Sequence, residues 1–315
     1  MTLDTRALRA LGWTDPPQQT ALIAGEVQLW LIKVPDAQLG IDALLARLTP
    51  AERDRAAAKR IPEKQREYVT GQAALRTLLA RQLRIDPMQV DYRRGIKGKP
   101  YLQDTSRIET GRIETGRIET GRIETGRIGT GLNESVVNDP ALKNTGHNDA
   151  AAPVKQQGLQ FNITHSGELV MVAMALDTEL GVDVEWHNER TDPHRVARRA
   201  FSKREQQALC NLPEHLQRAY FFALWTCKEA LVKCTGLGIH SGMANFEIVF
   251  DDTGGARVKA AWDTQRGVDR LCVVPLKLGA DNAGPHAGAL VHAPPALSTR
   301  HWILDASPDP LQGIA

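Results

Sequence analysis

Two acidic residues in one short apolar segment are the clearest candidates for chemistry in this sequence. The segment Gly181–Trp186 reads G-V-D-V-E-W, and its alternation predicts a strand with Asp183 and Glu185 on one face and two valines on the other. Carboxylates two residues apart on a strand lie roughly 7 Å from each other and repel unless a cation lies between them. The pair therefore indicates either a metal site or an acidic strand edge in solvent.

A third acid lies on a long helix that the sequence predicts from about Glu214 to Cys234. Trp225, Glu229 and Lys233 are four residues apart in turn, so they share one face of that helix. A surface ion pair between Glu229 and Lys233 is an alternative reading, but it does not explain the tryptophan on the same face. Because Mg²⁺ prefers carboxylate oxygens and leaves positions for substrate phosphates, we expect the three acids to hold Mg²⁺.

Basic residues elsewhere could bind the phosphates of a substrate. Lys97 and Lys99 flank Gly98, whose missing side chain lets backbone approach an anion. The spacing of a Walker loop is absent. Thr164 and His165 end a predicted strand in a polar turn, where an imidazole could reach a phosphate. Each feature alone is also typical of a solvated turn.

Two sets of elements must position these residues. In the first half, a strand is predicted at Val27–Val34 and helices at Ile41–Leu48 and Glu63–Leu83, and a capping box begins another helix at Thr49. In the second half, Ser202 begins a capping box that is followed by the long helix described above. The two halves resemble diverged copies. The predicted strands of the second half are Leu159–Thr164, Leu169–Leu176, Gly181–Trp186, Phe246–Phe250, Arg257–Ala261, Leu271–Val274 and Ala289–His292.

This pattern predicts an α+β fold of two similar lobes related by a pseudo-twofold axis, each a small, mostly antiparallel sheet packed on helices. We assign residues 1–102 to the N-terminal lobe, 159–300 to the C-terminal lobe with the metal site, and 301–315 to a tail.

Residues 103–158 separate the lobes and contain an array of pentapeptides, Arg-Ile-Glu-Thr-Gly, from Arg107 to Gly126, which ends in the variant Arg-Ile-Gly-Thr-Gly at 127–131. A period of five matches neither a helix nor a strand, and one isoleucine per unit cannot build a buried face. We predict a flexible insert. The alternatives are a docking arm or a short solenoid.

The composition of the chain limits its partners and location. It has 315 residues and a formal net charge of +2, so no general excess of charge favours a nucleic acid or an anionic membrane. No stretch is apolar and long enough to span a membrane, no secretory signal is evident, and the four cysteines show no metal or disulfide spacing. We expect a cytoplasmic monomer.

Five motifs, in this order, resemble those of the 4'-phosphopantetheinyl transferases of the surfactin-synthetase (Sfp) type. They are Gly98-Lys-Pro100, Phe161-Asn-Ile-Thr-His-Ser166, Gly181-Val-Asp-Val-Glu185, Phe201-Ser-Lys-Arg-Glu205 and Trp225-Thr-Cys-Lys-Glu-Ala230 with Lys233. The resemblance implies transfer of 4'-phosphopantetheine from coenzyme A, the co-substrate, to a serine of an apo acyl, peptidyl or aryl carrier protein. It also implies dependence on Mg²⁺ and release of adenosine 3',5'-bisphosphate.

The resemblance further implies the roles of individual residues. Glu229 and Lys233 would be catalytic, and Asp183, Glu185 and Glu229 would bind Mg²⁺. The residues expected to contact coenzyme A are Arg55, Arg94, Lys97, Lys99, Thr164, His165, Lys228 and Lys233. The base that takes the proton of the carrier serine is expected to be Glu229, directly or through a water. Glu205 is the alternative base, although its place in a capping box already explains it.

Two rival functions remain at this point. One is a carrier-binding module that has lost turnover, against which the intact acidic trio argues. The other is a nucleic-acid binder that uses the basic residues between Arg195 and Arg204, but neighbouring acids and few aromatic residues favour a solvated helix face.

Overall fold

The computed structural model describes residues 5–17, 20–35, 38–95, 99–102, 158–237, 242–261, 267–279, 285–304 and 311. Lys97 and the insert predicted at 103–158, apart from Gly158, lie outside the described residues, so the expectations for them stay predictions. The described part combines separate helices and largely antiparallel sheets, which confirms the α+β class.

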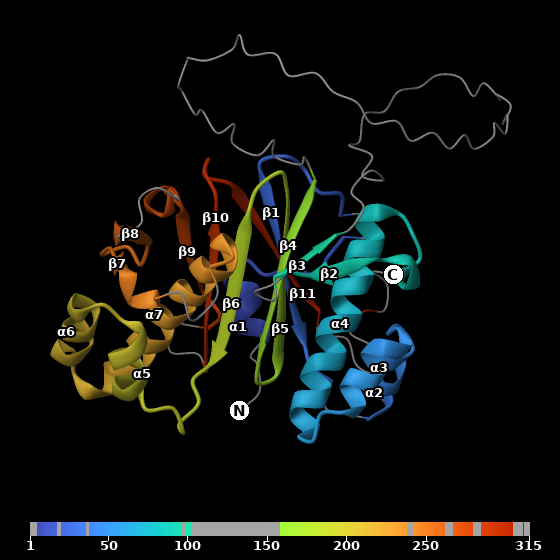
Figure 1. Ribbon diagram of the computed structural model, residues 1–315, viewed down its shortest axis with the longest axis horizontal. Coiled ribbons are helices and arrows are strands. Elements are labelled where there is room, and N and C mark those ends of the chain that lie inside the picture. The colour runs from blue at the N-terminus through green and yellow to red at the C-terminus, as the bar shows by residue number, and fades with distance from the viewer. Residues whose placement is uncertain are drawn as a thin grey trace, which may run out of the picture. The chain divides into compact units, whose positions relative to one another are not determined.

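The first sheet has four strands in the order β11-β1-β5-β4, where β1 runs parallel to β11 and antiparallel to β5. Helices α2, α3 and α4 cover one face of it (Figure 1). The bounds are β1 (Glu26–Lys33), β4 (Leu159–Ser166), β5 (Leu169–Leu176), β11 (Ser298–Leu304), α2 (Gln38–Leu45), α3 (Pro50–Ala57) and α4 (Pro62–Leu83).

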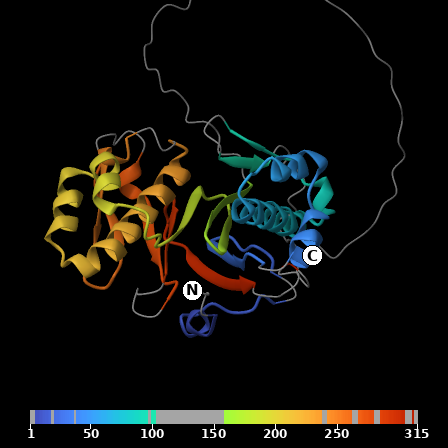
Figure 2. The same ribbon diagram turned by 90° about the horizontal axis from the view of Figure 1, so that it is seen from below.

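The second sheet has five antiparallel strands in the order β6-β10-β9-β8-β7. Helices α5, α6 and α7 pack on its other side, away from the first sheet (Figure 2). The bounds are β6 (Leu180–Trp186), β7 (Phe246–Phe250), β8 (Ala256–Ala261), β9 (Cys272–Leu276), β10 (His286–His292), α5 (Pro193–Ala200), α6 (Lys203–Asn211) and α7 (Glu214–Thr235).

Short elements complete the described chain. A two-stranded ribbon of β2 and β3 follows α4, and short 3-10 turns follow both long helices. None of the described helices has the length and apolar character needed to cross a membrane. The bounds are α1 (Thr5–Ala10), η1 (Pro87–Gln89), β2 (Tyr92–Arg94), β3 (Pro100–Leu102), η3 (Met243–Asn245) and η5 (Val268–Arg270).

Alternation along the strands divides the apolar side chains between separate cores. Trp30 and Ile32 of β1 pack toward α4, whereas Leu29 and Leu31 join a core shared with Val182 and other residues of the second sheet. A strand buried on both faces reads as a continuous apolar run, as β5 does throughout and β1 does from Leu29 to Ile32. The two sheets therefore share one buried layer, and each has its own long helix outside it.

The order of elements from β1 to β5 recurs from β6 to β10. Both halves run strand, three helices, a 3-10 turn and four strands, with η5 as an extra turn in the second. The capping boxes predicted at Thr49 and Ser202 are both present, and each begins the second helix of its half. The long helix that follows has 22 residues in each case.

The lobe boundaries drawn from the sequence differ from the sheets in two places. Residues 301–304, predicted to lie in a tail, belong to β11 and pair with β1. Strands β4 and β5, assigned to the C-terminal lobe, complete the first sheet beside β1. Both differences arise because strand partners are chosen by long-range packing, which local periodicity does not reveal.

Candidate active site

Strands β4 and β6 are edge strands of the two sheets, and side chains of β4 join them. The Asn162 side-chain oxygen accepts a hydrogen bond from the backbone N–H of Val182 at 3.1 Å. The Ser166 hydroxyl accepts one from the N–H of Trp186, also at 3.1 Å. Alternate side chains of one edge strand thus satisfy the free backbone groups of the other, and we call this junction the seam.

The seam also holds the two strand acids. The Thr164 hydroxyl donates to Asp183 Oδ1 at 2.9 Å, and the Ser166 hydroxyl donates to Glu185 Oε2 at 2.8 Å. Val182 and Val184 face the shared core, so the alternation predicted for this strand is confirmed. The side with the acids faces α7 rather than solvent, because Asp183 is only 3% exposed.

Helix α7 turns the face that carries Trp225, Glu229 and Lys233 toward these acids, and we call this face the α7 stripe. Lys233 Nζ lies 2.6 Å from Asp183 Oδ1, and the Trp225 indole N–H donates to Glu185 Oε1 at 3.3 Å. Glu229 lies between these two helix residues and is buried. The structure therefore brings together the three predicted acids and the lysine, and it explains the tryptophan.

Gly181 sets how closely α7 approaches β6. A Cβ at this position would collide with the backbone oxygen of Ala230 and the backbone nitrogen of Cys234. Backbone packs directly on backbone here, which only glycine permits. The contacted residues, Ala230 and Cys234, directly follow Glu229 and Lys233 on the helix, so this contact limits how far each of the two side chains must reach toward the strand.

Burial raises the pKa of all three acids, and repulsion from Asp183 adds to this at Glu185 and Glu229. Burial is the main cause at Asp183, where the Lys233 ammonium opposes it. Burial and then the charge of Asp183 raise the pKa of Glu185. Burial and then Asp183 raise the pKa of Glu229 to about 7, against an ordinary 4.5. A negative cluster of this kind favours a bound cation.

The donor set fits a hard cation in one further respect. Asp183 Oδ2 is buried and has no hydrogen-bond partner, although Oδ1 has two. Among the described residues, however, no group of three or more His, Cys, Asp or Glu side chains is already gathered in metal-binding geometry. The oxygens and the charge are therefore those that Mg²⁺ requires, but the carboxylates would have to close around it.

The predicted phosphate contacts are only partly brought together. Lys99 donates to the backbone oxygen of Cys234 at 3.0 Å, so the loop before β3 lies against the C-terminal end of α7. Arg55 and Arg94 are exposed on α3 and β2, so their predicted contacts with coenzyme A stay predictions.

Thr164 and His165 do not act as a pair on one group. They are neighbours on β4, so their side chains point to opposite faces. Thr164 contacts Asp183 and Lys233, whereas His165 Nδ1 lies 3.0 Å from Oε2 of Glu67 on α4. Both were expected to contact coenzyme A, but the Thr164 side chain is buried against Asp183 and Lys233, whereas the His165 side chain is partly exposed.

Lys228 and Glu205 are corrected more strongly. Lys228 is fully buried, and its ammonium contacts Glu205 at 2.9 Å and the backbone oxygens of Met243 and Phe246. Glu205 is 2% exposed and also accepts backbone hydrogen bonds, including one from Ile248. Lys228 therefore cannot contact coenzyme A, and Glu205 cannot serve as the base.

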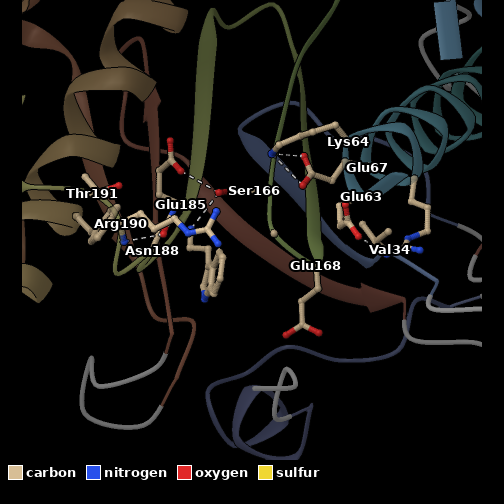
Figure 3. Close-up of a pocket in the computed structure, with 14 residues that line it drawn as sticks. Val34, Glu63, Lys64, Glu67, Ser166, Glu168, Glu185, Asn188, Arg190 and Thr191 are labelled. Atoms are coloured by element: carbon tan, nitrogen blue, oxygen red, sulfur yellow. Dashed lines mark hydrogen bonds and ion pairs between the residues drawn. The ribbon is translucent and has the colours of Figure 1, made fainter. Parts of the chain in front are cut away.

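A cavity of about 580 Å³ opens beside the acids. Figure 3 shows Glu185 and Ser166 on one side of it and Glu67 with Lys64 on the other. Trp186, an unusually exposed tryptophan, also lines it. The cavity lies at the Glu185 end of the site, whereas Lys233 and Lys99 lie at the other end of the α7 stripe.

No individual role was predicted from the sequence for Asn162, Ser166 or Glu67. The first two occupy alternate positions with Thr164 in one predicted strand, so a shared face was visible. Their partners on β6, and the place of Glu67 on α4, could come only from the tertiary structure.

The segment that contains the site is similar to known proteins. Residues 179–282 match the sequence model of the 4'-phosphopantetheinyl transferase superfamily, and this range contains all three acids and Lys233. The 4'-phosphopantetheinyl transferase HetI of Nostoc sp. is 27% identical over 249 residues, covering 79% of this chain and 84% of that protein. The 4'-phosphopantetheinyl transferase psf-1 of Bacillus pumilus is 38% identical over 109 residues, covering 34% of this chain and 46% of that protein.

A solved structure, the holo-[acyl-carrier-protein] synthase of Neisseria meningitidis, covers 37% of this chain and 98% of its own at 18% identity. Its TM-score of 0.31 is too low to support a structural argument. The sequence matches nevertheless confirm the resemblance found in the motifs. Through residues 179–282, the chain is similar to the 4'-phosphopantetheinyl transferase superfamily.

Proposed function

We propose that the protein transfers 4'-phosphopantetheine from coenzyme A to a serine of an apo carrier protein and releases adenosine 3',5'-bisphosphate, in a reaction that requires Mg²⁺. The observation that carries this proposal is the contact of Lys233 with Asp183 beside Glu185 and Glu229, all within the residues that match the superfamily. The names of the relatives point to the same activity.

Asp183, Glu185 and Glu229 would hold Mg²⁺, with Asp183 Oδ2 available as a ligand. When bound, the ion would neutralise negative charge on the pyrophosphate of coenzyme A. Lys233 would donate to the same phosphates, because its ammonium is partly exposed beside Asp183. Lys99 lies at that end of α7 and would extend the cationic surface toward the nucleotide.

Glu229 would act as the base. Its carboxylate lies buried between Trp225 and Lys233 on the helix face that meets Asp183 and Glu185, so it would take the proton directly or through a water. The serine oxygen forms a bond to the β-phosphorus, the bond from that phosphorus to the departing adenosine 3',5'-bisphosphate breaks, and the serine proton passes to Glu229. The departing bisphosphate carries additional negative charge, which Lys233 and Lys99 would stabilise.

The acceptor would approach through the cavity beside Glu185. In-line displacement requires the attacking oxygen to enter opposite the leaving group. Since the cations lie at one end of the α7 stripe and the cavity at the other, the carrier serine would enter past Trp186 and Ser166. This order along the helix supports the proposal that the two substrates approach from opposite ends.

We also propose that the two halves are related by a pseudo-twofold axis and that the enzyme is a cytoplasmic monomer. The recurrence of element order and of capping boxes supports the first part. Size-exclusion chromatography with light scattering would test the second.

The decisive experiment incubates the protein with coenzyme A, Mg²⁺ and a panel of apo carrier proteins, and reads each carrier by intact mass. Addition of phosphopantetheine to at least one carrier is the expected result, with none when EDTA replaces Mg²⁺. Glu229→Gln should lose transfer but retain coenzyme A binding by calorimetry. Absence of mass gain on every carrier, together with carrier binding, would instead favour a non-catalytic carrier-binding module.

A further inference from the structure

The buried ion pair between Lys228 and Glu205 has a counterpart in the other half of the molecule. In the first half, Arg76 Nε lies 2.7 Å from Glu52 Oε2, and both side chains are buried. Lys228 and Arg76 each lie 14 residues after the first residue of their helix, Glu214 and Pro62. Glu205 and Glu52 are each the acid of a capping box.

The backbone contacts of the two pairs also correspond. Lys228 donates to two backbone oxygens at the two ends of η3. One belongs to Met243, the first residue of η3, and the other to Phe246, the residue directly after η3. Arg76 donates to the oxygens of Pro87 and Val90, which hold the same places around η1. Each pair therefore ties its long helix to the preceding helix and to the following 3-10 turn.

Lys228 uses its donors completely. Its three N–H groups meet three acceptors, namely the Glu205 carboxylate and the two backbone oxygens. Glu205 is equally satisfied, because it also accepts from the backbone N–H groups of Ser202 and Ile248. A buried ion pair with every group satisfied fixes one arrangement of the elements that it joins.

The difference between the halves lies in the next residue. Lys228 is followed by Glu229 of the site, whereas Arg76 is followed by Thr77, which accepts a hydrogen bond from Arg47 and takes no part in the site. We propose that the Lys228–Glu205 pair is a positioning device that fixes the rotation and height of α7, so that Trp225, Glu229 and Lys233 face β6. This inference rests on the proposed function, and the Arg76–Glu52 pair supplies a control of the same design.

The test removes each pair as a unit, since removing one partner alone would leave a buried charge. The variant Lys228→Met with Glu205→Gln is compared with Arg76→Met with Glu52→Gln, each labelled with 5-fluorotryptophan. The fluorine resonance of Trp225, identified with Trp225→Phe, reports the place of α7 without substrate or metal. We expect it to move beyond its linewidth in the Lys228 variant and to stay unchanged in the Arg76 variant.

Binding and kinetics give the second readout. We expect the Lys228 variant to bind Mn²⁺ at least tenfold more weakly than the wild type, as measured by electron paramagnetic resonance. Its kcat should also fall at least tenfold, whereas its KM for coenzyme A should stay within twofold of the wild-type value. The Arg76 variant should keep all three within twofold. Equal responses of the two variants, or an unchanged Trp225 resonance in the Lys228 variant, would overturn the proposal.

If the Lys228 double variant does not fold, Lys228→Arg takes its place. Arginine serves at the corresponding position 76, so Lys228→Arg should retain the Trp225 resonance, and a displaced resonance in this folded variant would contradict the inference. If the wild-type protein transfers nothing to any carrier, the proposed function fails, while the fluorine comparison still tests the positioning role.

Discussion

The ammonium of Lys233 lies 2.6 Å from one oxygen of Asp183, and the other oxygen of that carboxylate is buried without a partner. The lysine therefore neutralises part of the negative cluster and leaves one oxygen available. Lys233→Met should reduce kcat/KM about 100-fold, equivalent to about 2.7 kcal/mol, because a cation is lost where charge leaves on the bisphosphate. Transfer assays with a carrier that the wild type modifies would measure this.

Lys259→Met is a matched control, because Lys259 also faces a carboxylate, that of Glu247, at 3.7 Å but on the surface. Its activity should match the wild type. Retained activity in Lys233→Met would contradict the role assigned to this lysine.

Glu229 should make the metal-free protein less stable as pH rises. The folded protein binds this proton more tightly than the unfolded chain, since the pKa rises from 4.5 to about 7. The free energy of unfolding therefore falls between about pH 4.5 and pH 7, by as much as about 3 kcal/mol. Urea unfolding in EDTA across this range should show a smaller decline for Glu229→Gln than for the wild type.

The exposed Glu214 on the same helix is the control, and Glu214→Gln should follow the wild-type pH dependence. Identical pH dependence in Glu229→Gln and wild type would show that this carboxyl titrates normally.

Gly181→Ala should displace α7 from β6, because the new methyl group would meet the Ala230 oxygen and the Cys234 nitrogen, which cannot yield independently of the helix. We expect a loss of at least about 2 kcal/mol in the free energy of unfolding, together with reduced transfer. Gly71→Ala on α4 is the control, since its methyl group would make ordinary contacts with side chains alone, those of Ile163 at 3.4 Å and Val170 at 3.9 Å. Chemical denaturation of both variants measures the difference, and equal stability would refute the close-contact argument.

His286 should contribute to instability in acid. It is 5% exposed, neither ring nitrogen has a hydrogen-bond partner, and burial, assisted by His187, lowers its pKa from 6.5 to about 4. The unfolded chain then binds the proton more tightly, so the free energy of unfolding falls as pH drops from about 6.5 toward 4. His286→Phe should reduce this loss, by up to about 3 kcal/mol at pH 4.5, as measured by urea unfolding.

The exposed His215 provides the comparison, and His215→Phe should leave the acid sensitivity unchanged. An unaltered pH dependence in His286→Phe would rule out this histidine as its source.

Much of the fold and of the site could be predicted from local patterns. Strand β5 was predicted at its observed bounds because it is a short continuous apolar run, and α7 to within one residue because it is a long segment with helical spacing. Alternation along β6 placed Asp183 and Glu185 on one face, and helical spacing placed Trp225 with Glu229 and Lys233. The superfamily match then confirmed the motifs that contain them.

Other features depended on which elements meet. The partners of Thr164 and His165, and the pairing of β11 with β1, involve residues far apart in the sequence. Lys228 illustrates the reason most clearly. Its place beside Glu229 in a motif that resembles the family implied a contact with coenzyme A. A helix places consecutive residues about 100° apart, so Lys228 points away from the site, and only the packing of α6 and β7 decides that its charge is buried against Glu205.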